Sequence, residues 1–319
     1  MRSKLVLVAV GGNALIRAGQ NGTAQEEFDN AVHTASAVVE LIRAGHRIVL
    51  THGNGPQVGA MLARSESSAA HSYRMPLDVC VAATQGEIGY VLQYAMWQML
   101  QQAGLKTPVV SLVTQVLVDR QDPAFDRPTK PIGPFYTREV AERHRDLFGW
   151  TIAEDPARGF RRVVPSPEPK EIIELEAIRA CVERGLVVIA AGGGGVPVFN
   201  DHDPANGVEA VIDKDHTSAI LASQLSADTF AIATDVEKVC LDYGKPTERT
   251  LSELAHADAR RYLAEGQFPA GSMGPKVQAA LVFLDRGGSD AIITDPAHLV
   301  DAVGGHGGTR FRREPSHAM

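Results

Sequence analysis

Short apolar runs alternate along the chain with longer stretches in which apolar residues return every three or four positions. Uninterrupted apolar runs rich in β-branched residues are typical of buried strands, whereas the wider spacing is typical of amphipathic helices. The pattern predicts helices that include residues 31–42, 217–225 and 277–284, and strands at residues 4–10, 47–51, 109–113, 186–191, 229–233 and 291–293. Because enough chain separates successive strands for a crossover helix, we expect an α/β fold with a mainly parallel central sheet and helices on both faces.

The texture changes between residues 119 and 169, where prolines and charged residues replace the apolar rhythm. Prolines at this density oppose a continuous helix or a central strand. We therefore predict that this segment is an inserted, protruding subdomain, or lid, within a single domain that spans residues 1–319. The alternative, a long surface loop without function, is disfavoured because such loops are uncommon in compact domains. We also expect the polar residues 310–319 to fray.

Three of the predicted strands run directly into glycine-rich turns, which contain Gly11-Gly12-Asn13, Gly53-Asn54-Gly55 and residues 192–195. Glycines let main-chain N–H groups point at an anion and let a phosphate approach the backbone closely. Three such turns suggest one phosphate-binding site, although a single Gly-Gly turn is equally compatible with a tight strand-to-helix connection. The spacing matches neither the GxGxxG of dinucleotide folds nor the GxxxxGK[ST] of P-loop enzymes, which excludes a P-loop NTPase.

Three lysines lie in settings that suit a phosphoryl group. Lys214 stands between two aspartates at a predicted strand-to-helix corner, and Lys276 follows a glycine-bearing turn at the start of a predicted helix. A lysine at a helix N-terminus is electrostatically unfavourable unless an anion is shared there, and phosphoryl transfer depends mainly on positioning and positive charge. Lys130, between two prolines of the predicted lid, is a third candidate. A surface ion pair at Lys214 and a solvent-facing Lys130 are the alternatives.

Composition and charge set limits on partners. The 319 residues are 44% hydrophobic and 22% charged, with a formal net charge of −7. These are the values of an ordinary globular protein, and without a signal-peptide pattern or an apolar run of about 18 residues we expect a cytoplasmic protein with no membrane partner. The chain has no basic block, so we expect no nucleic-acid partner. The cysteines are far apart and no histidine cluster has metal-ligand spacing, so we expect no metal ligands from the protein.

Several segments together resemble the carbamate kinases, a branch of the amino acid kinase family. The similarity extends over nearly the whole chain and rests on residues 11–15, 51–59, 76–80, 85–86, 89–90, 128–136, 161–167, 192–197, 212–215, 234–236, 244–246 and 271–276. Segments 11–15, 51–59 and 271–276 are shared in looser form by other members of the family, whereas segments 128–136 and 161–167 are much more specific to the carbamate kinases.

The resemblance implies an open αβα sandwich with a protruding subdomain, a homodimer, and reversible phosphoryl transfer between ATP and carbamate with Mg²⁺. In such enzymes the reaction commonly makes ATP from ADP and carbamoyl phosphate. By resemblance, Lys214 and Lys276 would neutralise charge on the transferring phosphoryl group, and Asp215 would hold both lysines. Lys130 would close over the substrate from the lid. The implied donors to the carbamoyl and phosphoryl groups are Gly11, Gly12, Asn13, Gly53 and Asn54, and the implied nucleotide side is Asp235, Val236, Val239, Tyr243 and Met273.

Two other functions stay open at this point. An enzyme of the same family with another carboxylate or phosphate acceptor, such as an acetylglutamate or uridylate kinase, would keep the fold, but the 119–169 insertion resembles that of the carbamate kinases. A non-catalytic anion- or nucleotide-binding protein is the other. The joint presence of Lys214, Asp215 and Lys276 argues against it, because a binding protein has no need to stabilise charge that develops only in a transition state.

Overall fold

An eight-stranded sheet forms the centre of the molecule. The computed structural model describes residues 3–11, 15–16, 19–20, 22–68, 71–156, 158–200, 207–269 and 271–313. The strands of the sheet are β1 (Leu5–Val10), β2 (Arg47–His52), β3 (Val109–Ser111), β9 (Val187–Ile189), β11 (Thr229–Ala233), β14 (Glu253–Ala255), β15 (Ala291–Thr294) and β16 (Thr309–Arg312). They lie in the order β14-β16-β15-β11-β1-β2-β9-β3. Neighbours pair parallel, except that β15 and β16 pair antiparallel.

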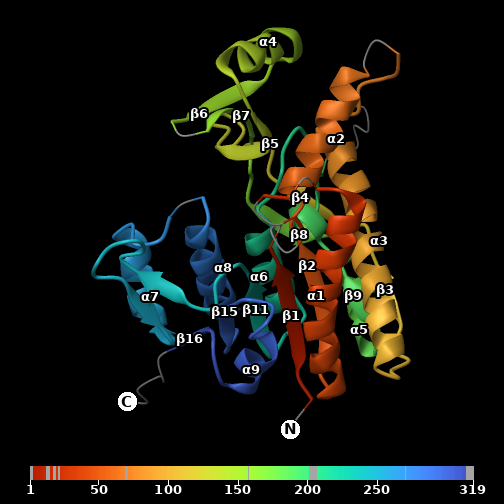
Figure 1. The fold of residues 1–319 in the computed structure, drawn as a ribbon, viewed down its shortest axis with the longest axis vertical. Helices are drawn as coiled ribbons and strands as arrows, with labels where there is room; N and C mark the ends of the chain where they lie inside the picture. The colour runs from red at the N-terminus through yellow and green to blue at the C-terminus, as the bar shows by residue number, and fades with distance from the viewer. Residues whose placement is uncertain are drawn as a thin grey trace.

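Helices cover both faces of this sheet (Figure 1). One layer consists of α1 (Ala24–Arg43), α3 (Leu77–Gln102) and α9 (Leu299–Gly304). The other consists of α5 (Leu175–Glu183), α6 (Lys214–Gln224), α7 (His256–Ala264) and α8 (Met273–Asp285). None of the helices in the described ranges combines the length and the apolar character that crossing a bilayer requires.

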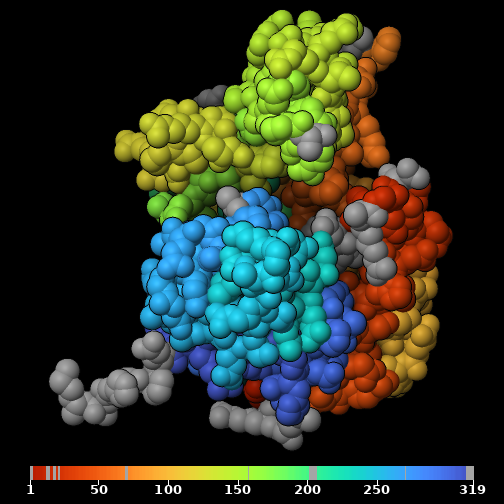
Figure 2. All heavy atoms as spheres, turned by 60° about the vertical axis from the view of Figure 1, so that its left-hand side comes forward, coloured from red at the N-terminus to blue at the C-terminus, as the bar shows by residue number. Residues whose placement is uncertain are grey.

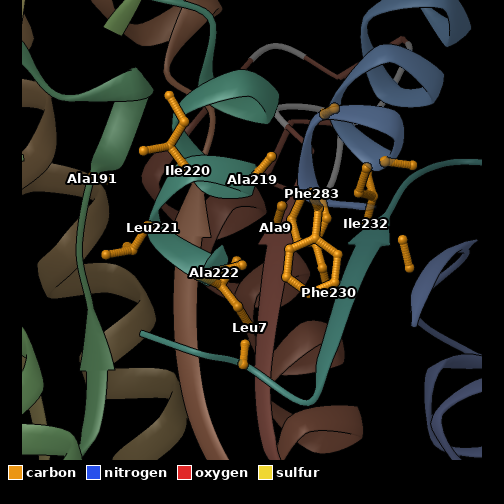
Figure 3. Packing of buried hydrophobic residues seen from close by; sticks show 14 of the residues in the cluster. Leu7, Ala9, Ala191, Ala219, Ile220, Leu221, Ala222, Phe230, Ile232 and Phe283 are labelled. Atoms are coloured by element: carbon orange, nitrogen blue, oxygen red, sulfur yellow. The ribbon is translucent and has the colours of Figure 1, made fainter. Parts of the chain in front are cut away.

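The strand β1 shows how the sequence builds the two layers. Successive side chains of a strand point to opposite faces, so Val6 and Val8 pack with the first helix layer, whereas Leu7 and Ala9 pack with the second. All four are fully buried. Figure 3 shows the second layer, where Phe230 of β11 lies against Phe283 of α8, with ring centroids 5.5 Å apart. Each such buried side chain contributes roughly 1.5–3 kcal/mol to folding.

The predicted fold class, an αβα sandwich with a mainly parallel sheet, is confirmed. The expectation that residues 310–319 fray is wrong for the first three of them, because residues 310–312 belong to β16. Phe311 is fully buried in the core, and the guanidinium of Arg310 pairs with Asp290 and donates to the carbonyl of Ala302. These long-range contacts give the otherwise polar segment a place in the sheet.

A smaller three-stranded sheet stands apart from the main body, at the top of Figure 1. It consists of β5 (Lys130–Tyr136), β7 (Gly159–Val164) and β6 (Thr151–Asp155) in that order, with α4 (Arg138–Phe148) packed on it. Figure 2 shows these residues, in lime green, above the cyan and blue C-terminal part of the body. Pro131 and Pro134 lie in β5, an edge strand, where a missing N–H is tolerated.

Three short strands lie at the base of this sheet: β4 (Gln115–Val118), β8 (Pro169–Ile172) and β10 (Val196–Val198). Because β4 pairs antiparallel with β8, with Val118 opposite Pro169, the two ends of the 119–169 segment lie side by side. The helix α2 (Gly55–Ser67) packs against β5 at two glycines. A Cβ at Gly59 would lie 2.0 Å from the Cα of Gly133, so no larger residue fits at position 59 without moving one backbone away from the other.

Candidate active site

The three glycine-rich turns follow strands that are neighbours in the sheet, so they gather at one edge of it. The Gly11 N–H donates to the carbonyl of Ala233 at 3.0 Å, and the Gly53 N–H donates to the carbonyl of Val10 at 3.1 Å. These two amides therefore extend the sheet ladder by one residue. The prediction that Gly11 and Gly53 donate to a substrate is corrected, because both N–H groups already donate to backbone carbonyls. The predicted Gly12 and Asn13 lie outside the described residues.

The turn at residues 192–195 packs tightly under the end of β2. A Cβ at Gly192 would lie 2.3 Å from Nε2 of His52, and a Cβ at Gly193 would lie 2.2 Å from Nδ2 of Asn54. All of Gly192, Gly193 and Gly194 are buried. The glycines of this turn thus make room for two polar side chains.

His52 and Asn54 are both buried beside the candidate phosphate site. Asn54 donates from Nδ2 to Oγ1 of Thr84 at 3.0 Å. The pKa of His52 is lowered to about 4, mainly by burial; the contact with the Gly53 carbonyl raises it and the nearby charge of Lys214 lowers it. His52 is therefore neutral at pH 7, and it presents no positive charge to an anion.

Lys214, Asp215 and Lys276 meet at the starts of two helices. Lys214 is the first residue of α6, and its Nζ lies 2.6 Å from Oδ1 of Asp215. Lys276 lies in the first turn of α8, and its Nζ lies 3.3 Å from Oδ2 of the same carboxylate. The three side chains are 12%, 5% and 15% exposed in that order. One buried carboxylate thus offsets two cations that their helix dipoles disfavour.

The pKa values in this cluster show which forces compete. Burial lowers the pKa of the Lys214 amine, and Asp215 opposes that effect while Lys276 adds to it. Burial also raises the pKa of Asp215, but the two lysines together outweigh it and hold that pKa below its usual value. The carboxylate is therefore ionised at neutral pH, and it favours the charged form of Lys214.

Lys130 reaches this region from the smaller sheet. Its Nζ lies 2.5 Å from Oδ2 of Asp213, and the two side chains are 29% and 27% exposed. Burial would raise the pKa of Asp213, but Lys130 and then Lys214 lower it well below the usual range. The structure therefore brings all three predicted lysines to one place, each on an aspartate.

A cavity of about 630 Å³ opens beside Lys276. Its wall includes Gly11, Lys276 and four residues predicted for the nucleotide side: Asp235, Val236, Tyr243 and Met273. The volume is within the usual range of small-molecule pockets. Lys276 therefore belongs both to the buried charge cluster and to the wall of this cavity.

Val239 does not line the cavity, which corrects that prediction. It begins β12 (Val239–Leu241), which pairs with β13 (Arg249–Leu251), and it is fully buried in the core. Its neighbour Cys240 lines the cavity in its place. Sequence reasoning missed Phe268, which lines the cavity, and gave no role to Asp213, although this residue lies in the segment 212–215 and pairs with Lys130. Glu237 and Lys238, which also line the cavity, directly follow the predicted Val236.

Comparison with known proteins identifies the family. A model of the amino acid kinase family matches residues 4–295. The chain belongs to this family. The predicted resemblance is confirmed as well: carbamate kinase of Pyrococcus furiosus is 48% identical over 310 residues, which cover 96% of this chain and 98% of that protein.

A carbamate kinase-like protein of Escherichia coli (strain K12) is 47% identical over 96% of this chain and 98% of its own length. The solved structure of carbamate kinase from Giardia lamblia bound to AMP-PNP superposes with a TM-score of 0.91 at 41% identity, and the match covers 98% of this chain and 99% of that one. Membership of this family makes the chain a phosphotransferase, as predicted.

Proposed function

We propose that this chain is a carbamate kinase, which transfers a phosphoryl group reversibly between ATP and carbamate and makes ATP from ADP and carbamoyl phosphate. The observation that carries the proposal is the position of Lys276, which contacts Asp215 together with Lys214 and also lines the cavity. Paired cations at the end of a cavity of nucleotide size suit transfer of a γ-phosphoryl group. The relatives named carbamate kinase support carbamate as the acceptor.

In the proposed mechanism, an oxygen of carbamate attacks the γ-phosphorus directly, and the bond from that phosphorus to the β,γ-bridging oxygen breaks, so that ADP leaves and carbamoyl phosphate forms. The protein therefore supplies alignment and charge instead of a nucleophile. Lys214 and Lys276 donate to phosphoryl oxygens while negative charge moves from one side of the phosphorus to the other. Asp215, with one oxygen on each lysine, fixes their spacing. Lys130 approaches the same group from the smaller sheet. The Asn54 amide, which uses one N–H for Thr84, offers its second N–H as a donor.

The nucleotide occupies the 630 Å³ cavity in this proposal, in contact with Asp235, Val236, Tyr243 and Met273. Mg²⁺ retains water and is commonly bound through substrate phosphates. In the part of the chain that the structure describes, no group of three or more His, Cys, Asp or Glu residues forms a metal site, and both oxygens of Asp215 contact lysines. A Mg²⁺ ion held mainly by the nucleotide's own phosphates, whose charge it neutralises, fits this set of residues.

We also propose that residues 119–169 act as a lid within one domain, and that the protein works as a cytoplasmic homodimer. An aromatic face on α3 supports the dimer. Tyr90, Tyr94 and Trp97 are 61%, 39% and 54% exposed. The ring of Tyr94 contacts those of Tyr90 and Trp97, and the rings of both tyrosines contact Phe28. Exposed aromatic side chains that adjoin one another are typical of a protein interface.

A second candidate keeps the fold and changes the acceptor. It is favoured by one observation: the two Escherichia coli relatives at 46% and 47% identity are named carbamate kinase-like, so similarity at this level is shared by proteins that differ in how their activity is named. The same lysines and cavity would then serve another carboxylate or phosphate.

The test is ATP formation from ADP, Mg²⁺ and carbamoyl phosphate, followed with a coupled assay. The Lys214→Ala variant, purified in parallel, controls for contaminating kinases. We expect robust ATP production that falls by about 10²-fold in the variant, the scale of losing one preorganised electrostatic group. Folded protein that binds ADP but makes no more ATP than the variant would favour the second candidate.

A further inference from the structure

The Asp213 carboxylate joins two parts of the molecule that are far apart in sequence. Its Oδ1 accepts hydrogen bonds from the backbone N–H of Asp215 at 2.9 Å and of His216 at 3.2 Å, which makes Asp213 the N-cap of α6. Its Oδ2 accepts from Nζ of Lys130 at 2.5 Å. One side chain therefore contacts both the helix that begins with Lys214 and the smaller sheet that carries Lys130.

Capping alone does not require this residue to be an aspartate. Asparagine and serine cap helices about as well as aspartate does, because the cap needs only one side-chain oxygen. The second oxygen and the negative charge are what hold the ammonium of Lys130. A charge-assisted contact of this kind is short and directional, so it restricts a long side chain that would otherwise sample many rotamers.

The surroundings leave Asp213 well placed for this role. Lys130 is the first residue of β5, three positions before Gly133, where β5 crosses α2 at close range. Lys214 follows Asp213 directly, and it turns to Asp215. Asp215 thus contacts Lys214 and Lys276, whereas Asp213 contacts Lys130.

We propose that Asp213 is the positioning residue for Lys130: it holds the ammonium at the start of α6, beside Lys214 and Asp215, and so fixes where the smaller sheet delivers its charge to the phosphoryl group. This inference rests on the proposed function for its catalytic consequence only. The contact itself has a consequence that is measurable without activity, because acylation of Lys130 requires its nitrogen to leave the carboxylate.

The experiment uses the full-length chain with Asp213→Asn, Lys130→Ala and the double variant. Asparagine preserves the cap, so the thermal midpoint should stay within about a degree of wild type. We expect Asp213→Asn to lower kcat/KM for carbamoyl phosphate about tenfold in the wild-type background and less than twofold in the Lys130→Ala background. Glu209→Gln is the matched control, because Glu209 also joins the body to the smaller sheet, through Arg162 at 3.3 Å, without touching Lys130.

The second measurement is acetylation of Lys130 by acetic anhydride, quantified by mass spectrometry against the exposed Lys245. We expect Asp213→Asn to accelerate the reaction of Lys130 several-fold and Glu209→Gln to leave it unchanged. Equal labelling of Lys130 in wild type and Asp213→Asn overturns the inference. So does a tenfold loss of kcat/KM that persists in the Lys130→Ala background, since Asp213 would then act through α6 alone. If the wild-type protein makes no ATP while Asp213→Asn still accelerates the labelling of Lys130, the result supports the positioning contact and contradicts the proposed function.

Discussion

Replacement of Asp215 by asparagine tests the central charge cluster most directly. The substitution keeps the shape of the side chain and removes its charge, so Lys214 and Lys276 lose the carboxylate that both of them contact. All three side chains are 15% exposed or less, which limits how far water can take over the role of the carboxylate. The variant leaves two like charges close together at the N-termini of two helices.

The expected loss of stability follows from this burial. Removing one partner of a buried ion pair costs roughly 3–5 kcal/mol. Because the lysines keep slight access to solvent, we take the lower end, about 3 kcal/mol. With an unfolding entropy of roughly 2.1 cal/mol/K per residue, this corresponds to a fall in the thermal midpoint of about 4–5 °C for a chain of 319 residues. Turnover should fall by about 10²-fold or more, since the two amines lose the group that sets their spacing.

Differential scanning calorimetry and the coupled ATP assay measure the two effects. Asp285→Asn is the matched control: Asp285 is 40% exposed and pairs with Arg260 and His256, so its loss should cost under about 1 kcal/mol and leave turnover unchanged. An Asp215→Asn protein with the wild-type midpoint and turnover within threefold of wild type would refute the reasoning, because it would show that the lysines do not depend on this carboxylate.

Three further predictions concern other parts of the molecule. The pKa of His52 is about 4 in the folded protein and near 6.5 in the unfolded chain, so the unfolded chain binds more protons between these pH values. The free energy of unfolding should therefore fall by up to about 3 kcal/mol as the pH drops from about 6.5 to about 4. In urea unfolding, His52→Gln should make the free energy of unfolding depend less on pH over this range. N-ethylmaleimide should modify Cys240 on the cavity wall and block nucleotide binding, and ADP should protect against this modification. The Cys240→Ser variant should resist it, and buried Cys80, whose pKa burial raises to about 11, should not react. Equal inactivation of Cys240→Ser and wild type would contradict this prediction. Trp97→Arg should convert the proposed dimer to a monomer in light scattering, and an unchanged mass would remove the α3 aromatic face from the interface.

The strands of the main sheet were predictable because their signal is local. The strand β11 has the predicted bounds, 229–233, and β15 extends the predicted 291–293 by one residue. In both, an apolar run alone indicates a buried strand, since parallel strands covered on both faces need no polar alternation. The αβα class followed from the order of such runs.

The strand β16 was not predictable in the same way. In β16, Arg310 is followed by Phe311 and further arginines, and this sequence pattern fits a polar tail as well as it fits a strand whose arginine has an acidic partner. The partner, Asp290, lies in a different segment and becomes visible only when β15 and β16 pair. Burial of an arginine depends on such a partner, which local pattern does not contain.

In the candidate site, too, residues with a local sequence signal were predictable, whereas contacts between distant segments were not. Lys214 was a candidate because it lies between two aspartates at a strand-to-helix corner, and Lys276 because a lysine at a helix start needs an anion. The resemblance then gave Asp215 its role. The contact between Lys130 and Asp213 joins residues 83 positions apart, so no spacing rule reaches it. The Val239 prediction was wrong although a signal existed: alternation along β12 turns Val239 and Leu241 to the core and Cys240 to the cavity.

The close contact between Gly59 and Gly133 also has a mechanical meaning. With backbone against backbone and no side chain between them, α2 and β5 have no room to move closer together at this contact. Lys130 lies three residues before Gly133, whereas α4 lies at the opposite end of the smaller sheet, at the top of Figure 1. A tilt of the smaller sheet about this contact would therefore move α4 through a wider arc than the backbone of Lys130, which lies about 10 Å along β5 from Gly133.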